Sequence, residues 1–391
     1  MLSRSLKRVD QIFGCAFYQK QNAKQYRLKV SNGMKTGDIV FYIGTYTDKT
    51  SRGIYGFRFD PVTGECTDPE LLAEMVSPSY LLMNNSRTVL YAVSEPTDES
   101  RGSVAAFAVD PVTGRLNKIN EVEAPGKGLC HIALDKQERY LFTVCYSEAT
   151  VQVYSLREDG SIGDITCIQQ HFGRGVHPYR QEKPHPHATC LTPDERYLCV
   201  CDLGIDRLVV YRFYRETGKL ERDEGMTLSL PPGCGPRHMI FHPSGKYAYV
   251  VTELSSQVIA LSYDADIGFT VLQVINALQD ERCDSAAAAI RIGRGGKHLY
   301  TSNRGEDSIA QFDIDMQTGK LERICNTPTQ GKHPRDFILD ESGSYLVCVN
   351  QNTDNILIYD VNQQDGTLSP RKEVRGISMP VCVVGFELSA F

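Results

Sequence analysis

Short apolar runs rich in Val, Tyr and Phe alternate with turns of Gly, Pro, Asp and Ser along most of the chain. The clearest example is the stretch Gly235–Glu253, in which two strand-like runs flank the turn Pro243–Lys246. Residues of this kind fit a pleated, half-buried surface, so the stretch predicts a β-hairpin. If the hairpin pairs symmetrically about its turn, Arg237 lies across from Thr252 and next to Glu253. An arginine and a glutamate then meet at the open end of the hairpin.

A turn that ends in glycine divides the chain into repeats of about 50 residues. It occurs as FDPVTGE, VDPVTGR, LREDGSI, YRETGKL, YDADIGF, IDMQTGK and VNQQDGT, with its glycines at Gly64, Gly114, Gly160, Gly218, Gly268, Gly319 and Gly366. Seven units of short strands are typical of a β-propeller with four-stranded blades. Helical periodicity is nearly absent between the turns, which excludes a solenoid of helix pairs. The predicted fold class is therefore all-β, a seven-bladed propeller.

The hairpin of Gly235–Glu253 recurs as the inner hairpin of each repeat, in six complete copies. The seventh copy is divided, because MPVCVVGFEL near the C-terminus supplies one strand and DIVFYIGTYT, residues 38–47, supplies others. Strands from both chain ends would then close the ring and leave no open sheet edge. We expect the propeller to span residues 38–388 as a single domain.

Aligning the six complete hairpins brings two sets of positions to the same end of each one. The start positions, at the beginning of the inner strand, hold Ser79, Cys130, His187, Arg237, Ala288 and Arg335. The end positions, at the end of the return strand, hold Glu95, Tyr146, Leu203, Glu253, Arg304 and Gln351. Since the innermost strand of a blade lines the central channel, both sets are expected to ring one mouth of that channel. Charged and titratable residues at equivalent positions of neighbouring blades indicate a functional site rather than a scaffold.

We expect substrate binding and catalysis at this channel mouth. The expected catalytic residues are His187, Glu253, Arg237 and Arg304, and the expected substrate-binding residues are Arg335, Arg180, Gln181, Glu95 and Asp202. His187 is predicted to lie across its hairpin from Asp202, whose carboxylate would orient the imidazole and raise its basicity. Arg180 and Gln181 belong to the His-, Gly- and Pro-rich segment 171–188, which is predicted to form a loop over the mouth.

Two further pairs of histidines call for separate interpretations. His131 and His238 lie one residue past the start positions, and we expect them to face between blades and serve packing. His185 and His187 have the spacing of a metal-binding pair, but no third ligand is spaced to complete a zinc site. The sequence therefore predicts neither a metal nor a cofactor.

Composition narrows the class of ligand and the compartment. The 391 residues carry a net charge of −6 with a sequence pI near 5.9, which argues against binding to nucleic acid or to an anionic membrane. No apolar run approaches the ~20 residues that a membrane span needs. The 13 cysteines are scattered without CxxC spacing, and many lie in apolar runs. Reduced thiols in the core, and hence a cytoplasmic protein, are expected.

The chain begins with a basic segment that lacks the repeat. Its first 33 residues carry Arg and Lys throughout and a single acid, Asp10. We expect residues 1–37 to be a flexible or loosely docked extension, with import into mitochondria as the alternative. The number of subunits is left open.

Five of the blade motifs together resemble the lactonase family of seven-bladed β-propellers, which includes propeller-type 6-phosphogluconolactonases and fungal carboxy-cis,cis-muconate cyclases. They are YIGTYTDKTSRGIYGFRFDPVTG, RQEKPHPHA, DLGIDRL, GPRHMIFHPSGKYAYVVTE and SNRGEDSIAQF, and the similarity runs from about Phe41 to Phe386. The resemblance implies lactone chemistry without a metal, with the family's site residues falling on His187, Arg237, Glu253 and Arg304. VCY, Val144–Tyr146, departs from the family, which often has an Asn before the Tyr.

The implied reaction is hydrolysis of a small anionic sugar lactone, above all 6-phosphogluconolactone. Opening a lactone needs a water activated at neutral pH and a place for negative charge on the carbonyl oxygen. His187 or Glu253 would take the proton from water, and Arg237 or Arg304 would stabilise the oxyanion. The remaining arginines of the mouth would hold the phosphate. Two alternatives stay open, a lactone-forming cyclase of the muconate type and a non-catalytic propeller that binds protein partners.

Overall fold

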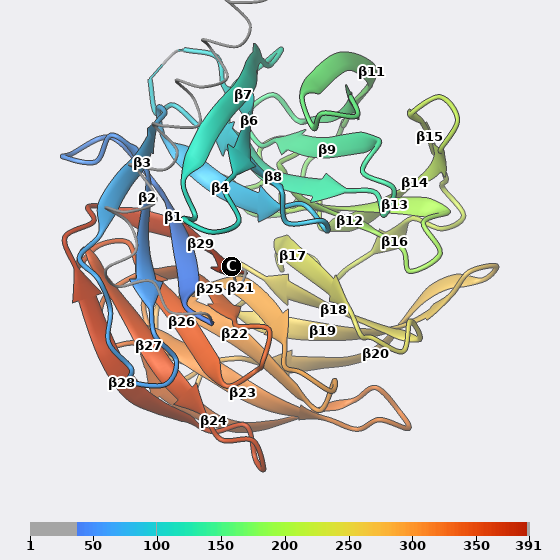
Figure 1. The fold of residues 1–391 in the computed structure, drawn as a ribbon. Helices are drawn as coiled ribbons and strands as arrows, with labels where there is room; N and C mark the ends of the chain where they lie inside the picture. The colour runs from blue at the N-terminus through green and yellow to red at the C-terminus, as the bar shows by residue number, and fades with distance from the viewer. Residues whose placement is uncertain (1–36, 99, 389–391) are drawn as a thin grey trace, which may run out of the picture.

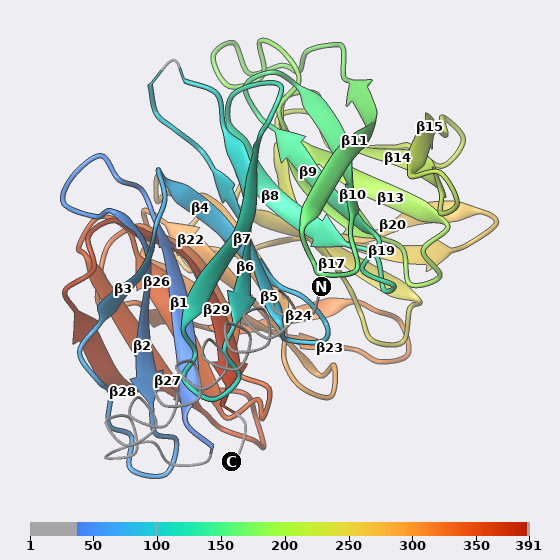
Figure 2. The same cartoon turned by 45° about the horizontal axis from the view of Figure 1, so that its top comes forward.

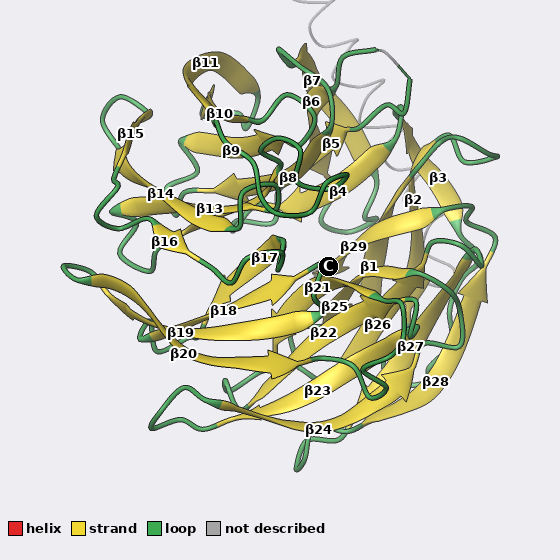
Figure 3. Cartoon of the chain, turned by 180° about the vertical axis from the view of Figure 1, so that it is seen from behind, coloured by secondary structure: helices red, strands yellow, loops and turns green. Residues whose placement is uncertain are grey.

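The protein forms a ring of seven β-sheets around a central channel (Figure 1). The computed structural model describes residues 37–98 and 100–388, and these residues form strands and loops only (Figure 3). Nothing in this part of the chain is a helix long and apolar enough to cross a membrane. The predicted seven-bladed propeller is confirmed. Apart from Gly37, the predicted N-terminal extension lies outside the described residues.

Each sheet is one blade, and we number the blades in chain order. Blade 1 is β4 (Pro78–Met83), β5 (Val89–Ser94), β6 (Ser103–Val109) and β7 (Leu116–Glu123), and blade 2 is β8 (Leu129–Leu134), β9 (Tyr140–Cys145), β10 (Thr150–Leu156) and β11 (Ile162–Gln170). Blade 3 is β12 (Pro186–Leu191), β13 (Tyr197–Asp202), β14 (Arg207–Tyr214), β15 (Lys219–Arg222) and β16 (Leu228–Ser229), and blade 4 is β17 (Pro236–Phe241), β18 (Tyr247–Thr252), β19 (Gln257–Asp264) and β20 (Gly268–Asn276).

The remaining blades continue the ring. Blade 5 is β21 (Ala286–Ile292), β22 (His298–Arg304), β23 (Ser308–Ile314) and β24 (Leu321–Pro328), and blade 6 is β25 (Pro334–Leu339), β26 (Tyr345–Asn350), β27 (Asn355–Val361) and β28 (Leu368–Arg375). Blade 7 joins β29 (Pro380–Glu387) to β1 (Ile39–Thr45), β2 (Gly53–Phe59) and β3 (Glu70–Glu74). Six blades have four strands as predicted, and blade 3 has five because β15 and β16 both pair with β14.

Blade 7 closes the ring with strands from both ends of the described chain. Its innermost strand β29 pairs antiparallel with β1 from Ile39 opposite Glu387 to Thr45 opposite Pro380 (Figure 2). This pairing gives the last strand of the chain a partner and leaves no open seam between first and last blades. The predicted closure by both chain ends is confirmed.

The glycine of the repeated turn fixes how neighbouring blades pack. Gly319 ends one such turn with φ of 71°, a left-handed conformation that suits glycine. A Cβ atom there would collide with the ring of Tyr247 in the preceding blade. The adjacent Tyr249 donates a hydrogen bond of 3.0 Å to the carbonyl oxygen of Gly319. Tyr42, Tyr91 and Tyr300 make the same bond to Gly114, Gly160 and Gly366.

The innermost strands of neighbouring blades contact one another all the way round, so they form the channel wall. Each of the seven carries a β-bulge near its first residue, where the pairing with the return strand shifts by one. A bulge places an extra residue on one strand and re-aims the side chains beside it. In blade 4 the extra residue is Arg237, between the pairs Pro236–Thr252 and His238–Val251.

The bulges correct one prediction about the channel. His131 and His238 do not pack between blades, because the ring of His238 in blade 4 lies 5.2 Å from that of His131 in blade 2. It also lies 6.0 Å from the ring of Tyr80 in blade 1. Rings from blades that are not neighbours in the circle can meet only inside the channel. The bulge turns both its own residue and the next one toward the axis, which simple alternation along a strand does not anticipate.

Candidate active site

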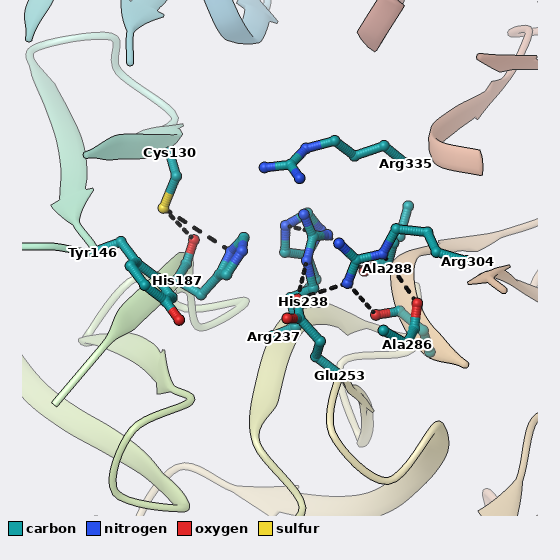
Figure 4. Close-up of polar contacts among 12 residues, drawn as sticks. Cys130, Tyr146, His187, Arg237, His238, Glu253, Ala286, Ala288, Arg304 and Arg335 are labelled. Atoms are coloured by element: carbon teal, nitrogen blue, oxygen red, sulfur yellow. Dashed lines mark hydrogen bonds and ion pairs between the residues drawn. The ribbon is translucent and has the colours of Figure 1, made fainter. Parts of the chain in front are cut away.

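A single carboxylate, that of Glu253, lies among three arginines at the channel mouth, and Figure 4 shows two of them, Arg237 and Arg304. Arg237 reaches it from the bulge of β17, and Arg304 reaches it from the end of β22. Oε2 of Glu253 lies 2.7 Å from Nη2 of Arg304 and 3.1 Å from Nε of Arg237. The Nε contact is an ion pair by distance only, since it lacks hydrogen-bond geometry. The predicted meeting of Arg237 and Glu253 is confirmed.

Arg180 supplies the third guanidinium of what we call the arginine clamp, Arg180, Arg237 and Arg304 around Glu253. Its Nη2 donates to the other carboxylate oxygen of Glu253 and lies 3.5 Å from the hydroxyl of Tyr146. Arg180 comes from the loop between β11 and β12, so this loop does reach the mouth as predicted. Its side chain is 41% exposed, whereas Arg237 and Glu253 are 3% and 4% exposed. Only the loop arginine is open to solvent.

The clamp keeps Glu253 ionised. Burial by itself raises the pKa of this carboxyl, but Arg304 and Arg237, with smaller effects of His187 and Arg180, hold it well below its usual range. Burial and the like charges of Arg304 and Arg335 lower the pKa of Arg237 to about 10. The channel mouth therefore holds guanidiniums that repel one another, and a further bound anion would reduce this repulsion.

His187 occupies the bulge of β12 and is 5% exposed. Burial first, and then the charge of Arg237, lower its pKa well below the ordinary value. The imidazole is therefore neutral at neutral pH. Its Nδ1 lies 4.0 Å from Sγ of Cys130, and its ring meets the edges of Tyr146 and His238 at 5.8 and 5.3 Å.

His238 orients Arg237, a role that the sequence analysis missed. Nη1 of Arg237 lies 3.1 Å from Nε2 of His238 and donates a hydrogen bond of 2.8 Å to the carbonyl oxygen of Ala288. An arginine has no acceptor, so Nε2 of His238 must be the unprotonated nitrogen of a neutral ring. The proximity of Arg237 adds to burial in lowering the pKa of His238, which fits that assignment.

Arg335 and Glu95 lie in a second group at the mouth. They form no ion pair with each other. Instead, the hydroxyl of Tyr46 is hydrogen-bonded to both side chains. Tyr46 follows the return strand β1 of blade 7 and so holds the end position of the divided blade. The sequence motif YIGTYT carried this signal, since its Tyr46 follows the strand as Glu95 and Glu253 follow theirs.

Asp202 does not orient His187, and the predicted pair is wrong. The bulge places Pro186, not His187, opposite Asp202. The fully buried carboxylate instead lies 2.6 Å from Nδ1 of His171 and accepts hydrogen bonds from the backbone N–H groups of His185 and Gly204. Asp202 therefore ties down both ends of the loop that carries Arg180.

Gln181 is likewise turned away from any ligand. Its side chain is fully buried, and its oxygen accepts from the backbone N–H groups of Val176 and His177. Its amide nitrogen donates to the carbonyl oxygen of Leu203 and to Asp206. Because its amide bonds to its own loop and to the turn between β13 and β14, Gln181 shapes and anchors the loop, and the prediction of a ligand contact is not supported by its geometry.

We expect Asp202→Ala to lower the free energy of unfolding by about 2 kcal/mol, because it leaves buried donors of the loop without an acceptor. Urea denaturation at pH 7 measures this. The matched control is Asp266→Ala, which removes a carboxylate that is 83% exposed and should change stability by less than about 0.5 kcal/mol. Equal stabilities of the two variants would show that Asp202 does not hold the loop.

Comparison with known proteins agrees with the fold. A sequence model described as lactonase, seven-bladed beta-propeller, matches residues 40–385. A 6-phosphogluconolactonase of Bacillus subtilis is 38% identical over 88% of this chain and 97% of its own length. A 6-phosphogluconolactonase of Formosa agariphila is 32% identical over 84% of this chain and 94% of its own length. The structure of a periplasmic gluconolactonase of Pseudomonas aeruginosa superposes with a TM-score of 0.85 at 29% identity, covering 90% of this chain and 99% of that one.

Proposed function

Because this chain belongs to the lactonase family of seven-bladed β-propellers, we propose that it hydrolyses 6-phosphogluconolactone to 6-phosphogluconate at the channel mouth. The relatives named 6-phosphogluconolactonase support this substrate, since they match nearly their whole length. The observation that carries the proposal is a buried imidazole, His187, at the same channel mouth as a carboxylate that is clamped by arginines.

His187 is the base in the mechanism that we propose. Its free ring nitrogen takes a proton from a water as the water oxygen attacks the lactone carbonyl carbon. Glu253 is a weaker candidate, because three guanidiniums occupy its oxygens and hold its pKa well below the usual range. We assign Glu253 the role of positioning Arg237 and Arg304.

The two buried arginines stabilise the charge that develops. Attack converts the carbonyl oxygen to an oxyanion, and Arg304 or Arg237 donates hydrogen bonds to it. The tetrahedral intermediate then expels the ring oxygen, which receives the proton from the His187 imidazolium and becomes a hydroxyl group. The products are a free carboxylic acid, which ionises at neutral pH, and a regenerated neutral imidazole.

The net charge of the mouth fits a phosphorylated substrate. Four guanidiniums, those of the arginine clamp and of Arg335, face two carboxylates, Glu253 and Glu95. The excess of two positive charges matches a phosphate monoester, which carries about −1.5 to −2 at pH 7. Arginine also binds phosphate with paired hydrogen bonds, which a single ammonium cannot do.

The test is turnover of freshly made 6-phosphogluconolactone, coupled to NADPH formation by 6-phosphogluconate dehydrogenase and corrected for spontaneous hydrolysis. We expect wild type to exceed the background, and Arg304→Ala to lose about 100-fold in kcat, as removal of an oxyanion donor does. Arg196→Ala, an exposed arginine that pairs with Asp266, is the matched control and should retain activity.

A wild type that does not exceed the background rate would overturn the proposed substrate. A carboxylated muconate would then be tested for cyclisation, since the same arginines would bind its carboxylates.

The thiols support our proposal that the enzyme works in a reducing compartment such as the cytoplasm. Every cysteine of the described residues is unpaired, and most of these thiols are buried. Burial raises the pKa of Cys190 to about 12, which leaves this thiol protonated and unreactive.

A further inference from the structure

Arg335 differs from the three arginines of the clamp in its partner. Each of Arg180, Arg237 and Arg304 lies in ion-pair contact with Glu253. Arg335 makes no ion pair with any described carboxylate, and its Nη2 donates instead to the hydroxyl of Tyr46 at 2.7 Å. A hydroxyl oxygen accepts a hydrogen bond but does not cancel the charge of the guanidinium. Arg335 therefore keeps a full positive charge for a ligand.

Tyr46 holds Arg335 in two ways. Its hydroxyl accepts from Nη2, and Cζ of Arg335 lies 5.2 Å from the centre of the tyrosine ring. Contact of a guanidinium with the ring and the hydroxyl of the same tyrosine restricts both its position and its tilt. Tyr46 is itself 8% exposed and is fixed by a backbone hydrogen bond to Met379.

Glu95 fixes the direction of the Tyr46 hydroxyl. The hydroxyl donates its single proton to Oε2 of Glu95 at 2.8 Å, so a lone pair is left to face Arg335. Tyr46 thus stands between a cation and an anion that would otherwise be free to pair. It keeps Glu95 from forming a direct ion pair with Arg335.

This group continues the ring of charged side chains at the channel mouth from the clamp into the next blades. Arg335, Tyr46 and Glu95 follow or begin strands of blades 6, 7 and 1, whereas Glu253, Arg237 and Arg304 belong to blades 4 and 5. Figure 4 shows the guanidinium of Arg335 pointing toward the space above Arg237 and Arg304. A lactone bound against the clamp would thus also lie within reach of Arg335.

We propose that Tyr46 is a positioning residue that holds Arg335 as the anchor for the phosphate group, and that it thereby sets a preference for phosphorylated over unphosphorylated sugar lactones. This inference rests on the proposed function, since it concerns the substrate of the same site. It predicts that loss of the Tyr46 hydroxyl lets Glu95 and Arg335 pair directly, which removes the free charge that the phosphate requires.

The test compares kcat/KM for 6-phosphogluconolactone with that for unphosphorylated gluconolactone in wild type and Tyr46→Phe. We expect this ratio to fall about 10-fold in the variant, mainly through a higher KM for the phosphorylated lactone, as for loss of one hydrogen bond to a charged group. Tyr249→Phe is the matched control, because it removes a buried tyrosine hydroxyl that bonds to Gly319 away from the mouth. Its ratio should equal that of wild type.

A second variant keeps the inference open to refutation if Tyr46→Phe folds poorly. Arg335→Gln should lower the same ratio at least as much, because it removes the anchor itself. A loss that is equal for the two lactones, or one that is confined to kcat, would overturn the inference and leave lactone hydrolysis standing.

Failure of the proposed function would look different, since wild type would then turn over neither lactone. Binding of 6-phosphogluconate and of gluconate, measured by calorimetry, would still decide the role of Arg335. Wild type should bind the phosphorylated acid more tightly, and Tyr46→Phe should lose that difference. Equal binding of the two acids by wild type would refute the phosphate anchor.

Discussion

Replacing His187 by Ala is expected to lower kcat for 6-phosphogluconolactone by about 1,000-fold, within the range that a positioned general base contributes. The physical reason is that His187 supplies a buried, neutral imidazole inside the channel mouth, where its ring meets those of Tyr146 and His238. The neighbouring His238 has its Nε2 engaged with Arg237 at 3.1 Å. The same coupled assay measures the loss, with unfolding curves to show that the variant is folded.

His298→Ala is the matched control, because His298 begins β22 at the end opposite Arg304 and pairs with Asp313 of β23, away from the mouth. The pH profile adds an independent check on the role of His187. Since the pKa of His187 is lowered well below 6.5, the base form is complete at neutral pH and is lost only as pH falls through that lower value. We expect wild-type kcat/KM to be flat from pH 6.5 to 8. A rise centred near pH 7 would contradict the assignment.

The repeat made the fold predictable from the sequence. Turn glycines such as Gly319 recur because a left-handed turn and a tyrosine of the preceding blade both exclude a side chain there. The same regularity placed Arg237, Glu253 and Arg304 at one mouth, and the structure brings these three together. The comparison of equivalent positions succeeded because the start and end positions of the hairpins differ in charge from blade to blade. The apolar positions of the hairpin strands do not.

The predictions that failed depend on features that a repeat does not encode. A bulge adds one residue to a strand, and this separated Asp202 from His187 and turned His131 and His238 into the channel. Gln181 was expected to face the ligand because it follows Arg180. Its amide is instead hydrogen-bonded to the backbone of Val176 and of Leu203. Hydrogen bonds inside an irregular loop follow from its conformation, which composition does not specify.

Glu253→Gln is expected to lower the free energy of unfolding at pH 7 by about 3 to 5 kcal/mol, since removing one partner leaves buried charges uncompensated. The buried guanidiniums of Arg237 and Arg304 then face each other without the carboxylate that lies between them. Urea denaturation measures the difference. Glu341→Gln, which breaks the exposed pair with Arg87, is the control and should change stability by about 0.5 kcal/mol or less.

The loss of stability in Glu253→Gln is expected to depend on pH, because the pKa of Glu253 is lowered in the folded protein. A carboxyl whose folded pKa lies below its unfolded value of about 4.5 contributes stability above pH 4.5 and loses it as pH falls through the folded value. The gap between wild type and Glu253→Gln should therefore be full at pH 7 and shrink below pH 4.5. Inorganic phosphate should stabilise the variant more than wild type, because an anion can replace the missing charge among the arginines. Equal stability at pH 7, or a gap that widens in acid, would show that the clamp does not depend on this carboxylate.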